Sequence, residues 1–394
     1  MFSDYIRRLE PMRVCLFSDG FLPGIAGMEL AIHYLANALL DIGCDVTVIA
    51  KKNKDASRFD HDYNLVRYGH TFRGSGRSGC NFVSGILALI QEHKKRHFDV
   101  INCHGVFYAG SRAVFAKRFM NVPLVMTPHG DDVQSVPELG FGVRLRKKWD
   151  RIVRRNLHHA DAVTAISASM KNELSFLPNR KIFLIPNGVD AKRFSASRGN
   201  FLHELSSLDL NARIVLSVGR NRNVKGYEYG IRAMQILNQM EGFRDLVYVI
   251  IGQDTHLLGP LAQELSLQHK VILLPQQDHW TISRCYQSGW CFFSPSICEG
   301  LSLVSIEAMA AGLPLVVTDA PGNRDIIRDN RCGLIASNKD PLSMAKQIML
   351  LASDEKLYRN FAKTALEAAQ SYDWHNIAQK YLEVYRRVAD RCQR

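Results

Sequence analysis

Short apolar runs alternate with longer amphipathic stretches along this chain, and no other feature constrains the fold as strongly. The runs of the first half cover residues 14–20, 45–50, 99–104, 123–130, 162–167 and 182–188. They are almost continuously apolar, and most end in Gly, Ser or His, as buried parallel strands do. Between them, apolar residues recur at helical spacing, for example in 28–42 before Gly43. The alternation predicts a doubly wound α/β domain.

A second series of the same kind follows. Its apolar runs cover residues 213–220, 246–253, 271–277, 291–296, 313–320 and 333–337. The Ser- and Asn-rich segment 195–213 interrupts the rhythm and is interpreted as the connection between two domains. We therefore expect a Rossmann-like domain over 1–195, completed by a returning helix over 375–394, and a second one over 196–374. Ligands of such sheets bind beyond the carboxyl ends of the strands, so the two domains are expected to face a central cleft.

Composition excludes several classes of protein. The 394 residues are 46% hydrophobic and 22% charged, as in a globular protein, and no window approaches the roughly 18 uninterrupted apolar residues of a membrane span. The start of the sequence has no apolar core of a signal peptide, so we expect a cytoplasmic protein. Nine Cys occur singly without a C-x-x-C pair, which argues against a disulfide framework or a zinc ribbon.

Positive charge is concentrated in the first half of the chain. Of the formal net charge of +12, residues 1–195 carry 28 Lys and Arg against 18 Asp and Glu. An anionic partner, such as nucleic acid, a phospholipid surface or a phosphorylated substrate, would therefore meet this half.

Two loops of the second half carry groups suited to phosphate binding. The first reads V-G-R-N-R-N-V-K-G, where Gly219 permits close backbone approach and Arg220 and Lys225 can bind phosphate oxygens. The alternative for the two cations is ordinary solvation in a loop.

The second loop reads P-S-I-C-E-G-L-S-L-V-S-I-E-A-M-A-A-G-L-P and leads into a helix. Free N–H groups and the positive dipole end at the helix start would form an anion site. Glu307, one turn into the helix, could accept hydrogen bonds from a vicinal diol. Its alternative is a helix-surface carboxylate near a favourable dipole end.

Four motifs together resemble those of the family-4 retaining glycosyltransferases of GT-B fold. They are the spacing of Glu299 and Glu307, the E-G-x-x-L-x-x-x-E-A-M-A-x-G-x-P frame around it, the V-G-R…K-G loop, and I-P-N-G-V-D-x-x-x-F at 185–194. The resemblance extends from Arg13 to the closing S-Y-D-W-H-N-I segment. It implies that Arg220 and Lys225 bind the donor diphosphate and stabilise the leaving nucleoside diphosphate, that Glu299 holds the transferred sugar, and that Glu307 holds the ribose. It further assigns donor contacts to Gly219, Gln276, Gly300, Leu303 and Val304, with Gln276 near the nucleobase.

In the first half, F-L-P-G-I-A-G-M-E resembles the family's Gly-Gly-x-Glu loop, which contacts the donor phosphate. Ala26 stands where the first Gly is usual, which leaves Gly27 for this contact. His129 in T-P-H-G-D-D-V matches the family's His-Gly position, and its implied task is to orient the sugar or the acceptor hydroxyl. A structural His is the alternative. Asp131 and Asp132 are neighbours in an extended segment and would point to opposite faces, so we expect no metal site.

The segment 144–155 carries seven basic residues in twelve. One interpretation is a helix that lies on an anionic membrane surface; the other is a solvated helix packed through its apolar residues. The first interpretation uses the following cations: Arg144, Arg146, Lys147, Lys148 and Arg151.

The sequence thus predicts a retaining, metal-independent hexosyltransferase without a cofactor, for which the nucleoside-diphosphate sugar is a substrate. A UDP-sugar is the favoured donor, and GDP-mannose is the alternative. The acceptor is a hydroxyl, expected in the synthesis of a lipid-linked glycan or a bacterial surface polysaccharide. Peripheral association with the inner face of the membrane is also expected. The alternatives are a GT-B nucleotide-sugar epimerase and a basic nucleic-acid-binding protein. No recognised nucleic-acid module is present, so no nucleic-acid partner is expected.

Overall fold

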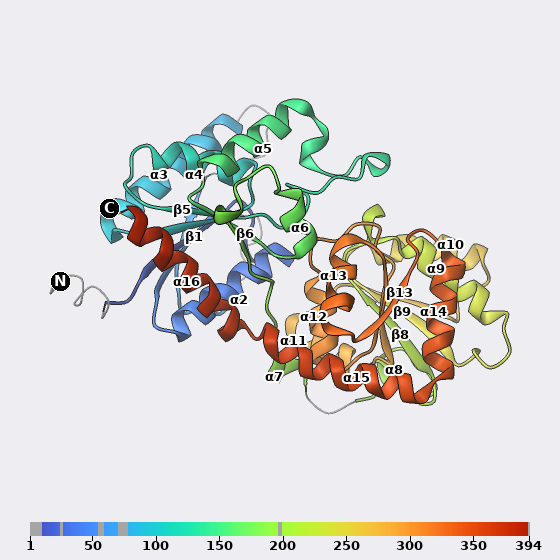
Figure 1. Cartoon of the computed structure of the whole chain (residues 1–394). Coiled ribbons are helices and arrows are strands. Elements are labelled where there is room, and N and C mark those ends of the chain that lie inside the picture. Colours follow the sequence, from blue (N-terminus) through green and yellow to red (C-terminus); the bar gives the residue numbers. More distant parts are fainter. Residues whose placement is uncertain (1–9, 24–26, 54–58, 70–77, 196–198, 393–394) are drawn as a thin grey trace. The chain divides into compact units, whose positions relative to one another are not determined.

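The computed structural model describes residues 10–23, 27–53, 59–69, 78–195 and 199–392 (Figure 1). The chain divides into two compact units. The first comprises Met1–Gly188 together with Trp374–Arg394, and the second comprises Val189–Asp373.

The first unit is built on a parallel sheet of seven strands in the order β3-β2-β1-β4-β5-β6-β7. The strands are β1 (Arg13–Ser18), β2 (Asp45–Lys51), β3 (Asn64–Tyr68), β4 (Val100–His104), β5 (Leu124–Thr127), β6 (Ala162–Ala165) and β7 (Ile182–Leu184). β4 and β5 are buried throughout, as expected for strands covered by helices on both faces.

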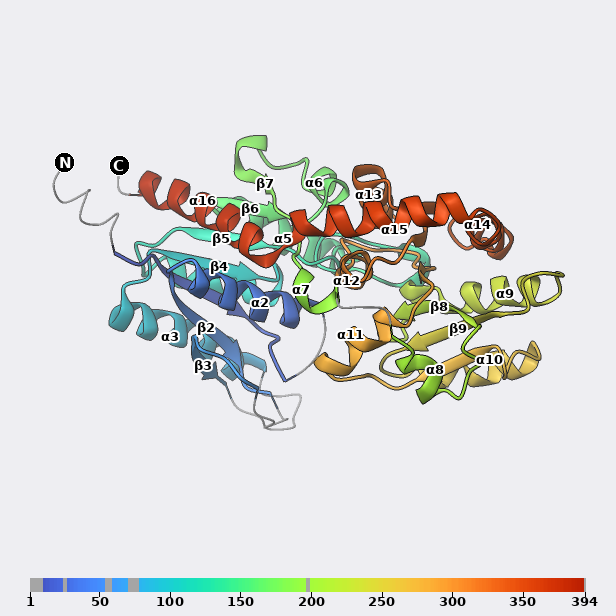
Figure 2. The same ribbon diagram turned by 90° about the horizontal axis from the view of Figure 1, so that it is seen from below.

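Two layers of helices cover this sheet. The helices are α2 (Gly27–Asp41), α3 (Ser78–Arg96), α4 (Tyr108–Lys117), α5 (Lys147–His159), α6 (Ala168–Glu173) and α16 (Trp374–Cys392). α4 packs between α3 and α5 on one face, while α16 packs on α2 at the other (Figures 1 and 2). Helices on both faces are the mark of the predicted doubly wound arrangement.

The returning helix α16 is an integral part of the first unit. Asn102 of β4 donates a side-chain hydrogen bond to the Tyr385 hydroxyl over 2.7 Å, and both residues are buried. At the start of the helix, the Trp374 ring stacks on Tyr34 and lies so close to Gly188 that a Cβ there would come within 2.5 Å of it. The prediction that a closing helix crosses back onto the first domain is therefore confirmed, and the helix covers Trp374–Cys392.

The second unit has a six-stranded parallel sheet in the order β10-β9-β8-β11-β12-β13. The strands are β8 (Arg213–Val218), β9 (Leu246–Ile251), β10 (Val271–Leu274), β11 (Cys291–Ser294), β12 (Leu315–Thr318) and β13 (Gly333–Ala336). The helices are α7 (Ala191–Phe194), α8 (Phe201–Leu205), α9 (Tyr227–Asn238), α10 (Gly259–Glu264), α11 (His279–Gln287), α12 (Leu303–Ala310), α13 (Pro321–Asn330), α14 (Pro341–Ser353) and α15 (Glu355–Ala369).

Both sheets reverse their strand order at one point, between β1 and β4 in the first unit and between β8 and β11 in the second. In open α/β sheets, ligands bind beyond the strand ends at such a point. The loops after these four strands are therefore where a site is expected in each unit.

The structure corrects the sequence analysis at three points: a missed strand, the segment 195–213 and the start of the second unit. β3 was not anticipated, because this edge strand, N-L-V-R-Y, has no continuous apolar run and only Tyr68 is fully buried. The segment 195–213 is not a bare connection: α8 lies in it, Leu202 is fully buried, and the Gly199 amide donates to Gln287 O over 3.2 Å. The second unit begins at Val189, whose amide donates to Tyr372 O, because α7 already packs on α11 and α12.

Within the described ranges, no helix combines the length and the apolar composition needed to cross a bilayer.

Candidate active site

The loops that follow β8 and β11 lie directly against each other. The Ile297 amide donates to Val224 O over 2.7 Å. Gly226 adopts φ +62°, and a Cβ on it would come within 2.3 Å of Pro295 O. Only glycine combines this left-handed backbone with so close an approach, which explains the K-G pair of the motif.

An ion pair connects these two loops. Lys225 Nζ lies 2.8 Å from Glu299 Oε2, and the side chains are 22% and 14% exposed. Lys225 is thus not a solvated loop cation. Arg220 is half-buried on the same loop and makes no hydrogen bond or ion pair with another described residue. The structure brings together a cation and a carboxylate at the end of the sheet, with a second cation on the same loop.

The start of α12 presents free backbone donors next to this pair. The first N–H groups of a helix have no intrahelical acceptor, and Leu303 and Val304 occupy these positions. The N-cap residue Ser302 makes no capping hydrogen bond, and its hydroxyl is buried without a partner among the described residues. Gly300 lies against α13, where the Gly322 amide donates to Glu299 O over 3.0 Å. Such a helix start favours an anion through its N–H groups and its dipole.

Glu307 is half-buried, not a plain surface carboxylate. The Tyr286 hydroxyl donates to Glu307 Oε2 over 2.9 Å. Burial raises the pKa of Glu307 above its usual value, while the Tyr286 hydrogen bond and the charge of Arg193 work against that rise. Tyr286 and Arg193 were not found from the sequence, because neither lies in the motif that contains Glu307.

Gln276 follows β10 at the far edge of the sheet and is exposed. Its neighbour Gln277 folds back and donates to Pro275 O over 2.9 Å. No contact joins Gln276 to the groups described above within the part of the chain that the structure describes, so its expected role at the nucleobase stays a prediction.

In the first unit, His129 lies two residues beyond β5 and is half-buried. Its Nε2 lies 2.9 Å from Nδ1 of His104, the last residue of β4. Burial lowers the pKa of His129 to about 4 and that of His104 well below its usual value. Both rings are therefore neutral near pH 7. His104 was not singled out from the sequence.

Asp131 and Asp132 differ as their positions predict. Asp131 is exposed, whereas Asp132 is buried and accepts hydrogen bonds from the amides of Val106, His129 and Gly130. Asp132 thus fastens the loop after β5 to the loop after β4. Burial raises the pKa of Asp132 to about 7. No group of three or more His, Cys, Asp or Glu side chains suited to a metal ion occurs among the described residues.

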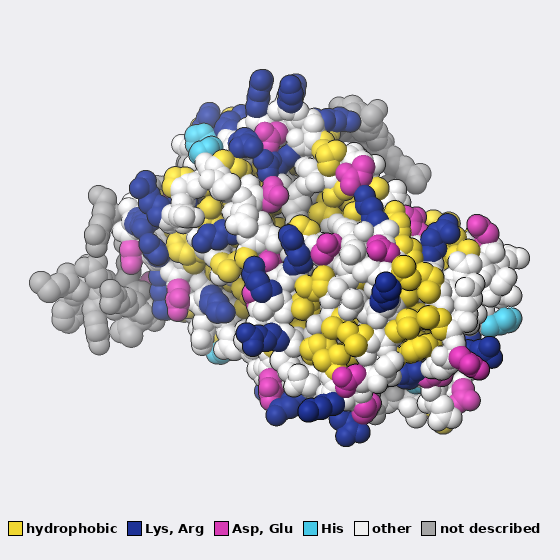
Figure 3. Space-filling view, turned by 45° about the vertical axis from the view of Figure 1, so that its right-hand side comes forward, with side chains coloured by type: hydrophobic (Ala, Val, Ile, Leu, Met, Phe, Trp, Pro, Cys, Tyr) yellow, Lys and Arg dark blue, Asp and Glu magenta, His cyan; other side chains and the backbone are white. Residues whose placement is uncertain are grey.

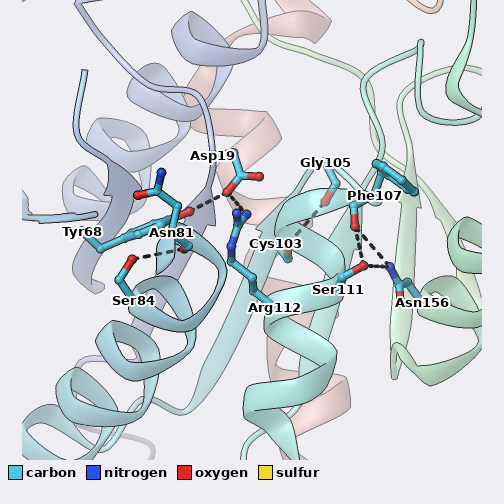
Figure 4. A network of polar contacts seen from close by, with 10 residues as sticks. All are labelled: Asp19, Tyr68, Asn81, Ser84, Cys103, Gly105, Phe107, Ser111, Arg112 and Asn156. Atoms are coloured by element: carbon cyan, nitrogen blue, oxygen red, sulfur yellow. Dashed lines mark hydrogen bonds and ion pairs between the residues drawn. The ribbon is translucent and has the colours of Figure 1, made fainter. Parts of the chain in front are cut away.

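A second polar network lies at the ends of β1 and β3 (Figure 4). The Arg112 guanidinium forms an ion pair with Asp19, and the Tyr68 hydroxyl donates to the same Asp19 oxygen over 2.5 Å. Close by on α4, Ser111 accepts a hydrogen bond from Asn156 of α5 over 2.9 Å, and Asn156 also donates to Phe107 O over 3.4 Å (Figure 4). The first contacts join the ends of β1 and β3 to α4, and the second join α5 to the start of α4.

Gly27 is the first residue of α2 and is exposed. Ala26, the residue that departs from the expected Gly-Gly loop, lies outside the described residues. The phosphate contact expected at Gly27 stays a prediction.

The basic segment forms a short 3-10 turn and α5. Arg146, Lys147, Lys148 and Arg151 are exposed, and Figure 3 shows Lys and Arg side chains projecting where Figure 1 places α5. The structure removes Arg144 from this surface. Its guanidinium is only 14% exposed because it pairs with Asp150 over 2.7 Å and donates to Val133 O over 3.0 Å.

Comparison with known proteins follows the two units. Residues 25–193 match the sequence model of Glycosyltransferase Family 4, and residues 201–368 match that of Glycosyl transferases group 1. The chain belongs to the family-4 glycosyltransferases. The predicted family is thereby confirmed, and it favours a transferase over the epimerase and nucleic-acid-binding alternatives.

Two relatives of this glycosyltransferase match over nearly their full length. An uncharacterized glycosyltransferase of Methanocaldococcus jannaschii is 27% identical, with 95% of this chain and 98% of the relative covered. D-inositol 3-phosphate glycosyltransferase 2 of Catenulispora acidiphila is 24% identical, with 96% and 95% covered.

Solved structures establish the fold of this glycosyltransferase as GT-B. Sucrose-phosphate synthase from Thermosynechococcus elongatus superposes with a TM-score of 0.82 at 21% identity, over 96% of this chain and 99% of that one. HepE of Anabaena, in complex with UDP and glucose, gives a TM-score of 0.76 at 18% identity, over 95% and 99%. The predicted fold class of two Rossmann-like domains is confirmed.

Proposed function

We propose that this glycosyltransferase moves a hexosyl or N-acetylhexosaminyl group from a UDP-sugar to an acceptor hydroxyl with retention of configuration. The observation that carries the proposal is the Lys225–Glu299 pair beside the free amides of α12. A diphosphate needs cations and N–H donors, and a sugar needs a carboxylate that accepts from its hydroxyls. The chain supplies all of these at one sheet edge.

Arg220 and Lys225 would stabilise the leaving group. Negative charge develops on the diphosphate as the glycosidic bond breaks, and fixed cations aimed at that charge lower the barrier. The N–H groups of Leu303 and Val304 would bind the distal phosphate. We propose that positive charge from these groups takes this role and that catalysis needs no metal.

Glu299 and Glu307 would hold hydroxyls of the sugar and of the ribose. Tyr286 donates to Oε2 of Glu307, and we propose that Oε1 accepts from the ribose hydroxyls. His129, neutral near pH 7, would orient the sugar or the acceptor hydroxyl. For retention we propose front-face attack, in which the departing phosphate oxygen helps to remove the acceptor proton, in place of the covalent intermediate of a two-carboxylate glycosidase.

Uridine is favoured as the base because the structurally similar HepE binds UDP. Several relatives are named D-inositol 3-phosphate glycosyltransferase, a name that includes a phosphorylated, hydroxyl-bearing compound. A hydroxyl of a glycan or a lipid-linked sugar is the acceptor class that we propose, in surface polysaccharide or lipid-linked glycan synthesis.

The outer face of α3, α4 and α5 would bring the enzyme to such an acceptor at the cytoplasmic face of a membrane. α5 contributes the exposed cations Arg146, Lys147, Lys148 and Arg151, counting the residue before the helix. The neighbouring helices contribute exposed apolar side chains on their outward sides. These are Val83, Leu87, Tyr108, Phe115 and, just after α4, Phe119. Cations beside exposed aromatic rings are what an anionic bilayer surface binds.

A thermal-shift panel of UDP, GDP, ADP and their sugars tests the donor assignment. At a hundredfold excess over its dissociation constant, a ligand stabilises the folded state by about 2.7 kcal/mol. We expect UDP to raise the melting temperature of the wild type and of Arg232→Ala, a control cation exposed on α9, but not of Arg220→Ala. Selective stabilisation by GDP would make the donor a guanosine sugar, and no response to any nucleotide would contradict the proposed function.

A further inference from the structure

The buried neighbour of His129 has one nitrogen without a partner. His104 is 2% exposed, and its Nδ1 faces His129 Nε2 at 2.9 Å. The two rings are nearly parallel, with an interplanar angle of 26° and centroids 5.2 Å apart. His104 Nε2 is buried and has no hydrogen-bond partner among the described residues.

Two neutral imidazoles at this distance share a single hydrogen between His104 Nδ1 and His129 Nε2. Which of the two nitrogens carries this hydrogen decides the tautomer of both rings. If His129 Nε2 carried it, His104 would be left with an N–H at Nε2 inside the protein and no acceptor for it. If His104 Nδ1 carries it, the unpartnered atom is a bare nitrogen lone pair. Buried N–H groups without an acceptor are rarer than acceptors without a donor, so the second arrangement is favoured.

We propose that His104 is a positioning residue that donates its Nδ1–H to His129 Nε2 and thereby makes His129 an Nδ1–H hydrogen-bond donor. With Nε2 occupied, Nδ1 is the only ring nitrogen of His129 that can reach a ligand. A donor at this atom binds an oxygen lone pair of a sugar or acceptor hydroxyl. It does not remove a proton, because its own nitrogen is already protonated.

The surroundings hold this arrangement in place. Asp132 accepts from the amides of His129, Gly130 and Val106, so the loops that carry the two rings are tied to one carboxylate. Asn156 donates to Val106 O and fixes the loop after His104 from the other side. The rings therefore cannot separate without loss of several buried hydrogen bonds.

Nitrogen-15 NMR of histidine-labelled full-length protein at pH 7 tests the proposal directly. We expect the Nδ1–H tautomer for His129 in the wild type. His104→Asn keeps an amide N–H near the position of Nδ1 and should retain this tautomer, whereas His104→Leu removes the donor and should shift His129 toward Nε2–H. An Nε2–H tautomer for His129 in the wild type, or no change in His104→Leu, would overturn the proposal.

The effect of His104 on sugar transfer rests on the proposed function, and it is measured separately from the tautomer of His129. In His104→Leu we expect kcat to fall about 10–100-fold, as for other residues that orient a working imidazole through its second nitrogen. His104→Asn should recover most of the rate. The KM for the nucleotide sugar should stay within about twofold in both variants, because Arg220, Lys225 and Glu307, which we propose bind the diphosphate and the ribose, lie in the second unit. If the NMR result holds while kcat is unchanged, His104 still sets the tautomer and the proposed role of His129 in transfer is wrong.

Discussion

Lys225 Nζ and Glu299 Oε2 are 2.8 Å apart, although 74 positions separate the two residues in the chain. The pair spans the point where the strand order of the second sheet reverses, and both side chains keep a fraction of their surface in solvent. A ligand that carries phosphate and hydroxyl groups can therefore exchange partners with both residues without first uncovering buried charge.

Lys225→Ala should lower kcat/KM by about 10²–10³-fold, because a fixed donor to developing charge contributes about that much to a transition state. Steady-state transfer assays with the donor identified by the thermal-shift panel measure the loss. Lys363→Ala is the control, since Lys363 is 76% exposed on α15 and its ion pair with Glu367 spans 3.8 Å. Activity of Lys225→Ala within threefold of the wild type would contradict the role given to this residue.

Gly226→Ala should destabilise the second unit more than Gly242→Ala does. Both residues have positive φ, +62° and +89°, so both variants bear the backbone strain of about 1–2 kcal/mol. Only at Gly226 would the added Cβ also clash, at 2.3 Å from Pro295 O, whereas Gly242 has nothing within 4 Å. Urea unfolding of the two variants measures the difference. Equal losses in the free energy of unfolding would mean that Gly226 is not in close contact with Pro295 O.

Arg112→Met should lower the free energy of unfolding by about 3 kcal/mol, because removal of one member of a buried ion pair leaves the other charge uncompensated. Arg112 is only 7% exposed and Asp19 26%. Arg359→Met breaks a fully solvent-facing pair with Glu355 on α15 and should cost less than about 0.5 kcal/mol. A loss below 1 kcal/mol in Arg112→Met would show that the Asp19 network adds little to the first unit.

Acid should lower the free energy of unfolding of the wild type through protonation of His129. The pKa of this ring is about 4 in the folded protein against 6.5 unfolded, so between these values the unfolded chain binds a proton that the folded chain does not. Stability from this group is complete above pH 6.5 and falls as the pH drops to about 4, by up to about 3 kcal/mol. His104 acts in the same sense, while Asp132, with its raised pKa, acts in the opposite one.

Comparison with His129→Gln isolates this contribution. Chemical unfolding of both proteins at pH 4.5 and pH 7.5 should show a smaller acid loss in the variant. If the two losses are equal, the His129 ring is not desolvated as the structure indicates.

Reversal of charge in Arg146→Glu/Lys147→Glu/Lys148→Glu should reduce binding to vesicles of anionic lipid at least tenfold, since each surface cation contributes about 1 kcal/mol. Sedimentation with anionic and with neutral vesicles measures the effect. Phe115→Ser/Phe119→Ser should weaken binding as well, whereas Arg359→Glu/Lys363→Glu, on the second unit, should not. Unchanged binding in the triple variant would end the membrane interpretation of α5.

The alternation of apolar runs predicted both sheets, because strands such as β5 and β9 are buried throughout and consist almost entirely of apolar residues. β3 escaped because an edge strand is only partly covered and can be polar. α8 escaped because five residues are too few to show a helical period, although Leu202 anchors it in the core.

The site divides in the same way. Motif spacing predicted Lys225, Glu299 and Glu307 as site residues, and the structure places Lys225 against Glu299. Their partners could not be identified, because contacts such as Tyr286 with Glu307 and His104 with His129 are made between segments 21 and 25 residues apart that only the fold brings together. For Arg144 the sequence prediction failed in another way: the residue was assigned to the cationic surface, but its guanidinium forms an ion pair with Asp150.

The hydrogen bond from Asn102 to Tyr385 has a consequence for the order of events during synthesis. Asn102 is translated early, but its buried partner belongs to a segment translated only after the whole second unit. Until then, α16 does not cover the first sheet, and the apolar side chains that α16 buries stay exposed to solvent. The second unit, continuous in the chain, can finish first, so the first unit to be translated is the last to be completed.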